Sequence, residues 1–261
     1  MQLSVVIIAY NEERNIERCL KSVLGIADEI IVVDSFSTDR TAKICLQYNA
    51  RIIQHKFDGY GAQKRFATNQ ASFDYVLSLD ADEELSETLK KAIQVEKEKW
   101  SHTCYSFNRR NFYCGVPVRF CGWYPDKQVR LFNRLKINWN NKEVHESIEF
   151  RDKQDASHLE GDLNHYTCYS IAEHQEKERK YARINAAILI KKNKQIYLLT
   201  PYIKGAFRFF KTYIIKLGIL DGYYGWIISK TLATSSYYKY AWARLGIKSK
   251  SNAPGFISQN K

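Results

Sequence analysis

The sequence lacks the cysteine spacing that is typical of structural zinc sites. Its 261 residues include six cysteines, and none of these forms a Cys-x-x-Cys pair, so a structural zinc site of the usual spacing is not expected. No positively charged segment precedes the first apolar run, which is short and ends in Asn11-Glu12-Glu13. Neither a signal peptide nor a membrane span is therefore predicted at the N-terminus, and we expect a cytoplasmic protein with reduced thiols.

Glycine-rich phosphate-binding motifs are also missing. No Gly-x-Gly-x-x-Gly follows the first apolar run, and no Gly-x-x-x-x-Gly-Lys-[Ser/Thr] occurs anywhere in the chain. Both absences argue against a dinucleotide-binding Rossmann domain and a P-loop enzyme. A nucleotidyltransferase acting on a sugar phosphate would need a glycine-rich, basic loop after the first strand, where this chain reads AYNEERN.

Acidic residues are scarce in the C-terminal third. Residues 177–250 contain 16 Lys and Arg but only two acids, within a chain of net charge +12, so the remainder is close to neutral. Basic and aromatic residues alternate at short intervals from 201 to 245, and no apolar run approaches the roughly 20 residues that a membrane span needs. This composition is typical of helices that lie in a membrane interface. Single-stranded nucleic acid is the competing ligand, although no RNP1, KH or zinc-knuckle signature occurs. A further alternative, for part of the stretch, is that these helices simply pack on a catalytic domain.

The first hundred residues alternate between apolar, β-branched runs and helical patterns. This alternation predicts a parallel α/β sheet. Asn11 and Ser86 are the expected N-caps of the first and last of these helices. The expected strands are 3–9, 29–34, 50–56 and 74–80, and the expected helices are 11–24, 37–48, 61–71 and 86–100.

Polar residues follow three of these predicted strands. Asn11 and Glu12, Asp34, and Asp80 with Asp82 all fall at carboxyl ends, where open α/β sheets bind ligands. With so few glycines and so many carboxylates, a phosphate-bearing ligand would be held through Mg²⁺ or Mn²⁺. The competing interpretation of the acids at 80–84 is a surface loop that starts the next helix.

Three blocks resemble consecutive motifs of family 2 glycosyltransferases, which have the GT-A fold. They are SVVIIAYNEERNIERCLKSV, EIIVVDSFSTDRT and LSLDADEEL. Further blocks, GWYPDKQVRLFNR, KEVHESI, LNHYTCYS and GILDGYYGWIISKTLATSSYYKYAWARL, are similar to the lipopolysaccharide-core β-1,4-glucosyltransferase branch. The resemblance implies a GT-A catalytic domain over 1–168, with its nucleotide-binding half at about 1–100, its acceptor half at about 101–168, and a basic helical module over 169–261.

The resemblance also implies residue roles. Asp34 would contact the uracil or ribose of a UDP-sugar, and Asp82 would ligate the metal that bridges the diphosphate. Phe36 and Ser35 depart from the family, in which many relatives carry a glycine and a second acid there. The other donor-binding positions implied are Ala9, Tyr10, Asn11, Glu12, Asp80 and Ala81.

The expected reaction needs a base and a neutralised leaving group. Glu146 and Asp126 are the alternatives for the base that deprotonates the acceptor hydroxyl, and His145 is a candidate third metal ligand. Asp126 would be an ordinary turn residue, or a partner of Arg130 if the segment between them is helical. Arg130 is a candidate for contacting the donor diphosphate, and the alternative is that it is simply a partner of Asp126. Lys64 is a second candidate for the donor phosphates, and the alternative is that it lies on a solvated helix face. His165 is expected to make a structural hydrogen bond.

The sequence thus predicts an inverting, metal-assisted glycosyltransferase. It would move a hexose, glucose by resemblance to the branch, from a UDP-sugar to a lipid-linked saccharide, at the inner face of the plasma membrane, with no nucleic acid as partner. The alternative is a non-catalytic protein that binds nucleic acid or anionic lipid on a transferase-like fold.

Overall fold

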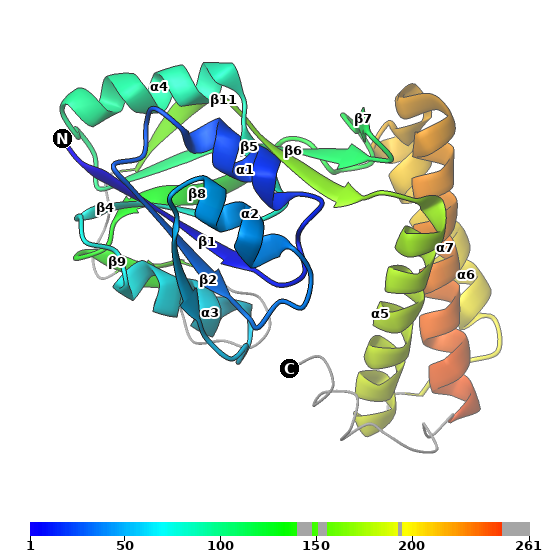
Figure 1. Cartoon of the computed structure of the whole chain (residues 1–261). Helices are drawn as coiled ribbons and strands as arrows, with labels where there is room; N and C mark the ends of the chain where they lie inside the picture. The colour runs from blue at the N-terminus through cyan, green and yellow to red at the C-terminus, as the bar shows by residue number, and fades with distance from the viewer. Residues whose placement is uncertain (140–147, 151–155, 193–194, 247–261) are drawn as a thin grey trace. The chain divides into compact units, whose positions relative to one another are not determined.

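The computed structural model describes residues 1–139, 148–150, 156–192 and 195–246. The chain divides into two compact units (Figure 1). The first comprises mainly residues 1–109 and 126–165, and the second comprises residues 110–125 and 166–260. Residues 110–125, which the sequence analysis placed within the catalytic domain, therefore belong to the second unit.

Four parallel strands form one half of the central sheet. They are β1 (Leu3–Ala9), β2 (Glu29–Asp34), β3 (Arg51–Gln54) and β4 (Tyr75–Asp80), in the order β3-β2-β1-β4. The four strands predicted from apolar runs are confirmed. β1 and β4 are buried on both faces, which is why their sequences are continuously apolar rather than alternating.

Antiparallel strands extend the same sheet beyond β4. β8 (Asp126–Asn133) pairs with β4, and β6 (Cys104–Tyr113) pairs with β8. β11 (Ala156–Cys168) follows in the sheet order and pairs with the short β5 (Glu83–Leu85). A two-residue strand, β7 (Val116–Pro117), pairs with β6, while β9 (Ile137–Trp139) and β10 (Ile148–Phe150) form a separate pair. The result is a mixed α/β fold with one predominantly parallel half.

Helices cover both faces of the parallel strands. α1 (Ile16–Val23), α2 (Thr41–Gln47) and α4 (Glu87–Glu98) pack on the face that carries Val5 and Ile7 of β1. α3 (Tyr60–Asn69) packs on the opposite face, against Val6. Successive β1 residues thus contribute to different cores, as the two-residue period of a strand requires.

One of the two predicted helix caps is confirmed. The Ser86 side chain accepts a hydrogen bond from the Leu89 amide at the start of α4, at 3.3 Å. Asn11 does not cap α1, which begins at Ile16 with Asn15 at the cap position. Asn11 instead has a φ of 53°, a left-handed conformation that asparagine tolerates. Its side-chain oxygen accepts a hydrogen bond from the Thr38 amide in the loop after β2.

The second unit is built mainly of helices. They are α5 (Ile171–Lys191), α6 (Thr200–Phe210), the π-helical turn Lys211–Ile215, the 3₁₀ turn Gly218–Asp221 and α7 (Gly222–Leu245). α7 packs against both α5 and α6 (Figure 1). A Cβ at Gly225 would lie 1.8 Å from the Gly218 carbonyl oxygen, so this close approach requires glycine. Among the described residues, no helix is both long and apolar enough to cross a membrane.

Candidate active site

Strand register brings the predicted strand-end residues to one edge of the sheet. Ala9 pairs with Asp34, and Ile8 pairs with Asp80, so the carboxyl ends of β1, β2 and β4 are level. Ala9 and Ala81 are buried there, whereas Tyr10 is exposed. The convergence expected from the alternating strands and helices is therefore present in the structure.

Hydrogen bonds join the loop after β1 to the loop after β2. The Asn11 amide donates to Ser37 Oγ at 2.8 Å, and Asn11 Oδ1 accepts from the Thr38 amide at 2.8 Å. The buried Asp34 carboxylate accepts from both the amide and the hydroxyl of Ser37. Phe36, where the resemblance implies a glycine in many relatives, has a φ of 61° and is exposed. It thus adopts a left-handed conformation, which glycine adopts without steric cost.

A buried charge network lies directly beneath this edge. Lys64 Nζ is 3.0 Å from Asp80 Oδ1, and Arg130 Nη2 donates to Asp80 Oδ2 at 2.8 Å and to Glu83 Oε1 at 2.8 Å. The Lys64 side chain is 1% exposed, which rules out the solvated helix face considered from sequence. Both cations also lie over the ring of Trp139, with Lys64 Nζ 5.0 Å from the centroid.

These contacts shift the pKa values of Asp80 and Arg130. Burial by itself would raise the pKa of Asp80, but Lys64 and Arg130 lower that pKa well below its usual range. Burial would lower the pKa of Arg130, but Glu83 and Asp80 raise it above its ordinary value. Asp80 is thus held ionised, with its charge neutralised by the protein itself.

Asp126 lies in a strand, and its partner is Arg109 rather than Arg130. Arg109 Nη2 is 2.7 Å from Asp126 Oδ2, and Gln128 Nε2 donates to Asp126 Oδ1 at 2.7 Å. Arg109 Nη1 also lies 3.6 Å from Glu83. The pairing of Asp126 with Arg130, considered only for a helical segment, is not formed because residues 126–133 are extended. Side chains four residues apart on a strand do not form the neighbouring pair that they form on a helix.

Glu12 and Asp82 lie at the same edge of the sheet. The pKa of Glu12 is raised because burial desolvates its carboxylate and because Asp82, Asp39 and Asp80 add negative charge nearby. Asp82 is partly exposed, and its Oδ2 lies 3.2 Å from His165 Nε2. A raised carboxyl pKa among acids marks a place where an added cation would be stabilised.

Few side chains near this edge of the sheet could ligate a metal ion. Among the described residues, no three His, Cys, Asp or Glu side chains gather closely enough to hold a metal ion by themselves. The predicted ligand His145 and the predicted base Glu146 lie outside the described residues. Asp82 and His165 form a carboxylate–imidazole pair within the described residues.

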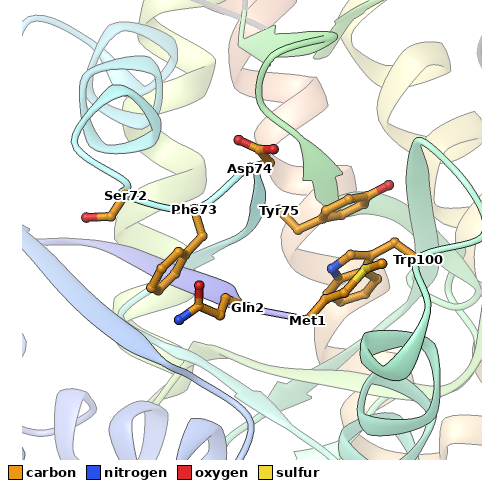
Figure 2. Close-up of a pocket in the computed structure, with 7 residues that line it drawn as sticks. All are labelled: Met1, Gln2, Ser72, Phe73, Asp74, Tyr75 and Trp100. Carbon is orange, nitrogen blue, oxygen red and sulfur yellow. The ribbon is translucent and has the colours of Figure 1, made fainter.

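A separate cavity of about 460 Å³ lies away from these residues. It is lined by residues that precede β1 and β4, among them Met1 and Asp74, with Tyr75 stacked on Trp100 at 4.4 Å (Figure 2). All the lining residues except Trp100 are at the amino ends of β1 and β4. The cavity is thus at the opposite end of β4 from Asp80 and forms no part of the candidate site.

Comparison with known proteins identifies the family. The family model described as "Glycosyl transferase family 2" matches residues 4–163. The chain belongs to this family. It is therefore a glycosyltransferase, and the GT-A fold implied by the motif resemblance agrees with the mixed sheet described above.

Relatives extend the similarity over most of the chain. An uncharacterized glycosyltransferase of Rickettsia typhi is 30% identical over 260 residues, covering 95% of this chain and 89% of the relative. The lipopolysaccharide core biosynthesis glycosyltransferase LpsC of Rhizobium meliloti is 29% identical over 198 residues, covering 71% of each chain. A solved structure of glucosyl-3-phosphoglycerate synthase from Mycobacterium tuberculosis with Mn²⁺ and UDP-glucose aligns over 43% of each chain, at 26% identity and a TM-score of 0.35.

Three residues that the structure brings to the candidate site were not assigned to it from the sequence. Glu83 and Arg109 complete the buried charge network, and His165 pairs with Asp82. Glu83 lies in a run of acids and Arg109 in a run of basic residues, so composition does not distinguish them from surface charges. The signal for His165 is the β11–β5 register, which pairs His165 with Glu83, one residue beyond Asp82.

Proposed function

We propose that the chain transfers a hexose, glucose in the first instance, from a UDP-sugar to a lipid-linked saccharide, with a divalent cation at the donor diphosphate. The observation that carries this proposal is that two neighbouring acids, Asp80 and Asp82, have different surroundings. Asp80 is neutralised inside the protein by Lys64 and Arg130, whereas Asp82 faces the edge of the sheet beside Glu12. This arrangement leaves a local excess of negative charge where the family resemblance places the diphosphate.

Asp82 and His165 fit a cation that is shared with the substrate. Mg²⁺ is commonly held by one or two carboxylates while phosphate oxygens and water complete its coordination, and Mn²⁺ takes the same oxygen ligands. The neutral imidazole of histidine is also a common metal ligand in proteins. A pair of protein ligands is thus sufficient, and three are not required. When bound, the cation would neutralise the charge that develops on the departing diphosphate.

The chain's own residues would bind the donor and accept the proton. The loops after β1 and β2, joined through Asn11, Ser37 and Asp34, would position the nucleoside. In a single inverting displacement, the acceptor oxygen forms a bond to the anomeric carbon while the bond to the diphosphate oxygen breaks. The acceptor proton passes to a carboxylate, for which Asp126 and Glu146 remain the two candidates. Asp126 is held in place by Arg109, whose Nη2 lies 2.7 Å from Asp126 Oδ2.

The proposed acceptor rests on similarity rather than on the site. The resemblance to lipopolysaccharide-core enzymes and the similarity to LpsC both support a lipid-linked saccharide. The charge and apolar surface of the second unit, described below, agree with an acceptor carried by a membrane.

Calorimetric titration with UDP and UDP-glucose tests the donor site. We expect binding with Mn²⁺ or Mg²⁺ that is lost in chelator and weakened at least tenfold in Asp82→Asn, because that change removes the carboxylate charge at the edge. Asp74→Asn is the matched control, since Asp74 is an exposed aspartate at the other end of β4. Binding of equal strength in Asp82→Asn and the wild type would refute the metal assignment. An absence of nucleotide binding under all conditions would favour a non-catalytic protein.

A further inference from the structure

The second unit exposes an unusual amount of apolar surface on α6 and the turns that follow it. Phe207 is 56% exposed and Phe210 is 51% exposed. Other large apolar side chains that are exposed between residues 197 and 223 are Tyr197, Leu198, Leu199, Tyr202, Ile203, Ile214, Ile215, Leu217, Ile219, Leu220 and Tyr223. So much exposed apolar side chain in one segment indicates an interaction surface rather than scattered surface hydrophobes.

Helix geometry arranges part of this set as a stripe. Leu199, Ile203, Phe207, Phe210 and Ile214 recur at intervals of three and four residues, so they lie along one side of α6 and its π-helical continuation. The side that packs against α7 is different. It includes Gly205, where an added Cβ would lie 3.3 Å from the Ala233 carbonyl oxygen. The apolar stripe is therefore additional to the face that α6 uses within its own unit.

A basic stripe runs beside the apolar one. Lys204, Arg208 and Lys211 are exposed, and each follows an apolar-stripe residue by one position, about 100° further around the helix. In the region 195–246 the only acid in the sequence is Asp221, whose carboxylate accepts hydrogen bonds from the Arg119 and Phe120 amides at 3.0 and 2.8 Å. No acidic side chain of this region is thus left to neutralise the basic stripe.

We propose that the surface formed by these two stripes docks on an anionic lipid bilayer. The apolar stripe would enter the boundary between headgroups and acyl chains, and the basic stripe would contact anionic headgroups. Long basic side chains next to an apolar face suit this boundary because their charged ends reach the headgroups while their stems remain in apolar surroundings. This inference does not depend on the identity of the sugar donor.

Charge and chemistry favour lipid over other occupants. A second copy of the chain would place one basic stripe near another, and like charges repel at an interface. A nucleic acid would pair with the basic stripe and stack on Phe207 and Phe210. It would leave the aliphatic members of the apolar stripe, Leu199, Ile203 and Ile214, without an apolar partner, since stacking platforms for bases use aromatic rather than aliphatic side chains.

Vesicle sedimentation of the full chain tests the proposal. We expect co-sedimentation with phosphatidylcholine vesicles that contain phosphatidylglycerol, and weaker binding to phosphatidylcholine alone. In Ile203→Ser/Phe207→Ser/Phe210→Ser, binding to both vesicles should fall at least tenfold. In Lys204→Gln/Arg208→Gln/Lys211→Gln, binding to the anionic vesicles should fall by roughly a hundredfold. The preference for phosphatidylglycerol should then be nearly lost.

A control pair in the first unit separates docking from a general loss of apolar surface. Leu46 and Val95 are 64% and 68% exposed, and Leu46→Ser/Val95→Ser should bind vesicles as the wild type does. Circular dichroism establishes that every variant is folded, and nucleotide titration reports separately on the donor site. The proposal is overturned if the wild type sediments with neither vesicle or if the control pair loses as much binding as the triple serine variant. It is also overturned if the serine variant dissociates a dimer that exists without lipid, or if single-stranded RNA binds more tightly than the anionic vesicles.

Discussion

At the scale of single residues, the candidate site around Asp82 lies next to a buried ion pair between Lys64 and Asp80, whose charges neutralise each other. Asp80 accepts from Lys64 and Arg130, while Arg130 also reaches the fully buried Glu83. Removing one member of such a network leaves an uncompensated buried charge, which typically costs about 3–5 kcal/mol. We infer that the network's role is to hold the strand-end loop that carries Asp82 in one conformation.

The lowered pKa of Asp80 predicts a specific dependence of stability on pH. Because the folded pKa lies below the unfolded value of 3.8, the unfolded state binds this proton first as pH falls. The contribution of Asp80 is therefore fully present above about pH 5 and is lost as pH falls through 3.8 and below. The free energy of unfolding, measured with urea between pH 6 and pH 2, should fall more steeply in the wild type than in Asp80→Asn, by up to about 1.4 kcal/mol per pH unit.

The comparison with Asp80→Asn isolates this one group. Glu12 has a raised pKa and so an effect of opposite sign, which disfavours the folded state as pH rises. Burial and the charges of Asp82 and Asp39 contribute more to this raised pKa than Asp80 does, so the Glu12 effect differs little between the two proteins. The variant should also be less stable than the wild type at neutral pH. Parallel pH profiles for the two proteins would show that Asp80 does not titrate as its contacts indicate.

At the scale of elements, the two loops at the carboxyl ends of β1 and β2 form one hydrogen-bonded structure. Asn11 and Phe36 have left-handed backbone conformations, which allow both loops to turn sharply enough for Ser37 and Thr38 to reach Asn11. Asparagine adopts this conformation at little cost, but a non-glycine residue such as phenylalanine costs about 1–2 kcal/mol there. Phe36 is thus a strained position within an otherwise well-bonded loop.

Replacing Phe36 therefore predicts an ordering of stabilities. Phe36→Gly should exceed Phe36→Ala in the free energy of unfolding by about 1 kcal/mol, because alanine keeps the Cβ that disfavours a φ of 61° while glycine does not. Little packing is lost in either variant, since the ring is exposed. Urea denaturation of the two variants provides the measurement. Equal stabilities would mean that the loop relaxes to another conformation once the ring is gone.

At the scale of the whole molecule, charge and chemistry are segregated between the two units. The acids of the donor site lie in the first unit, and the excess of Lys and Arg lies in the second. This segregation places an anion-attracting surface and a cation-attracting site on different parts of one chain. It explains why the net charge of +12 does not oppose a cluster of carboxylates at the sheet edge.

Donor binding should stabilise the folded chain by mass action. With Mn²⁺ present, UDP at about one hundred times its dissociation constant should raise the free energy of unfolding by about 2.7 kcal/mol, because the unfolded chain has no site. Thermal unfolding, followed calorimetrically, should show the increase in the wild type and in Asp74→Asn. A shift that persists in chelator, or in Asp82→Asn, would contradict a shared cation at this edge.

The sequence by itself determined the parallel half of the sheet and the edge at which the site lies. Continuous β-branched runs specify doubly buried strands, and Asp34 and Asp80 directly follow such runs, so their convergence depends only on local pattern and on the parallel arrangement. Tertiary structure alone decided which charges meet. Lys64, Arg109 and His165 reach the site through helix packing and through the register of β6, β8 and β11, which join residues far apart in the chain. Local periodicity does not encode that register, so a buried lysine and a solvated one look the same in the sequence.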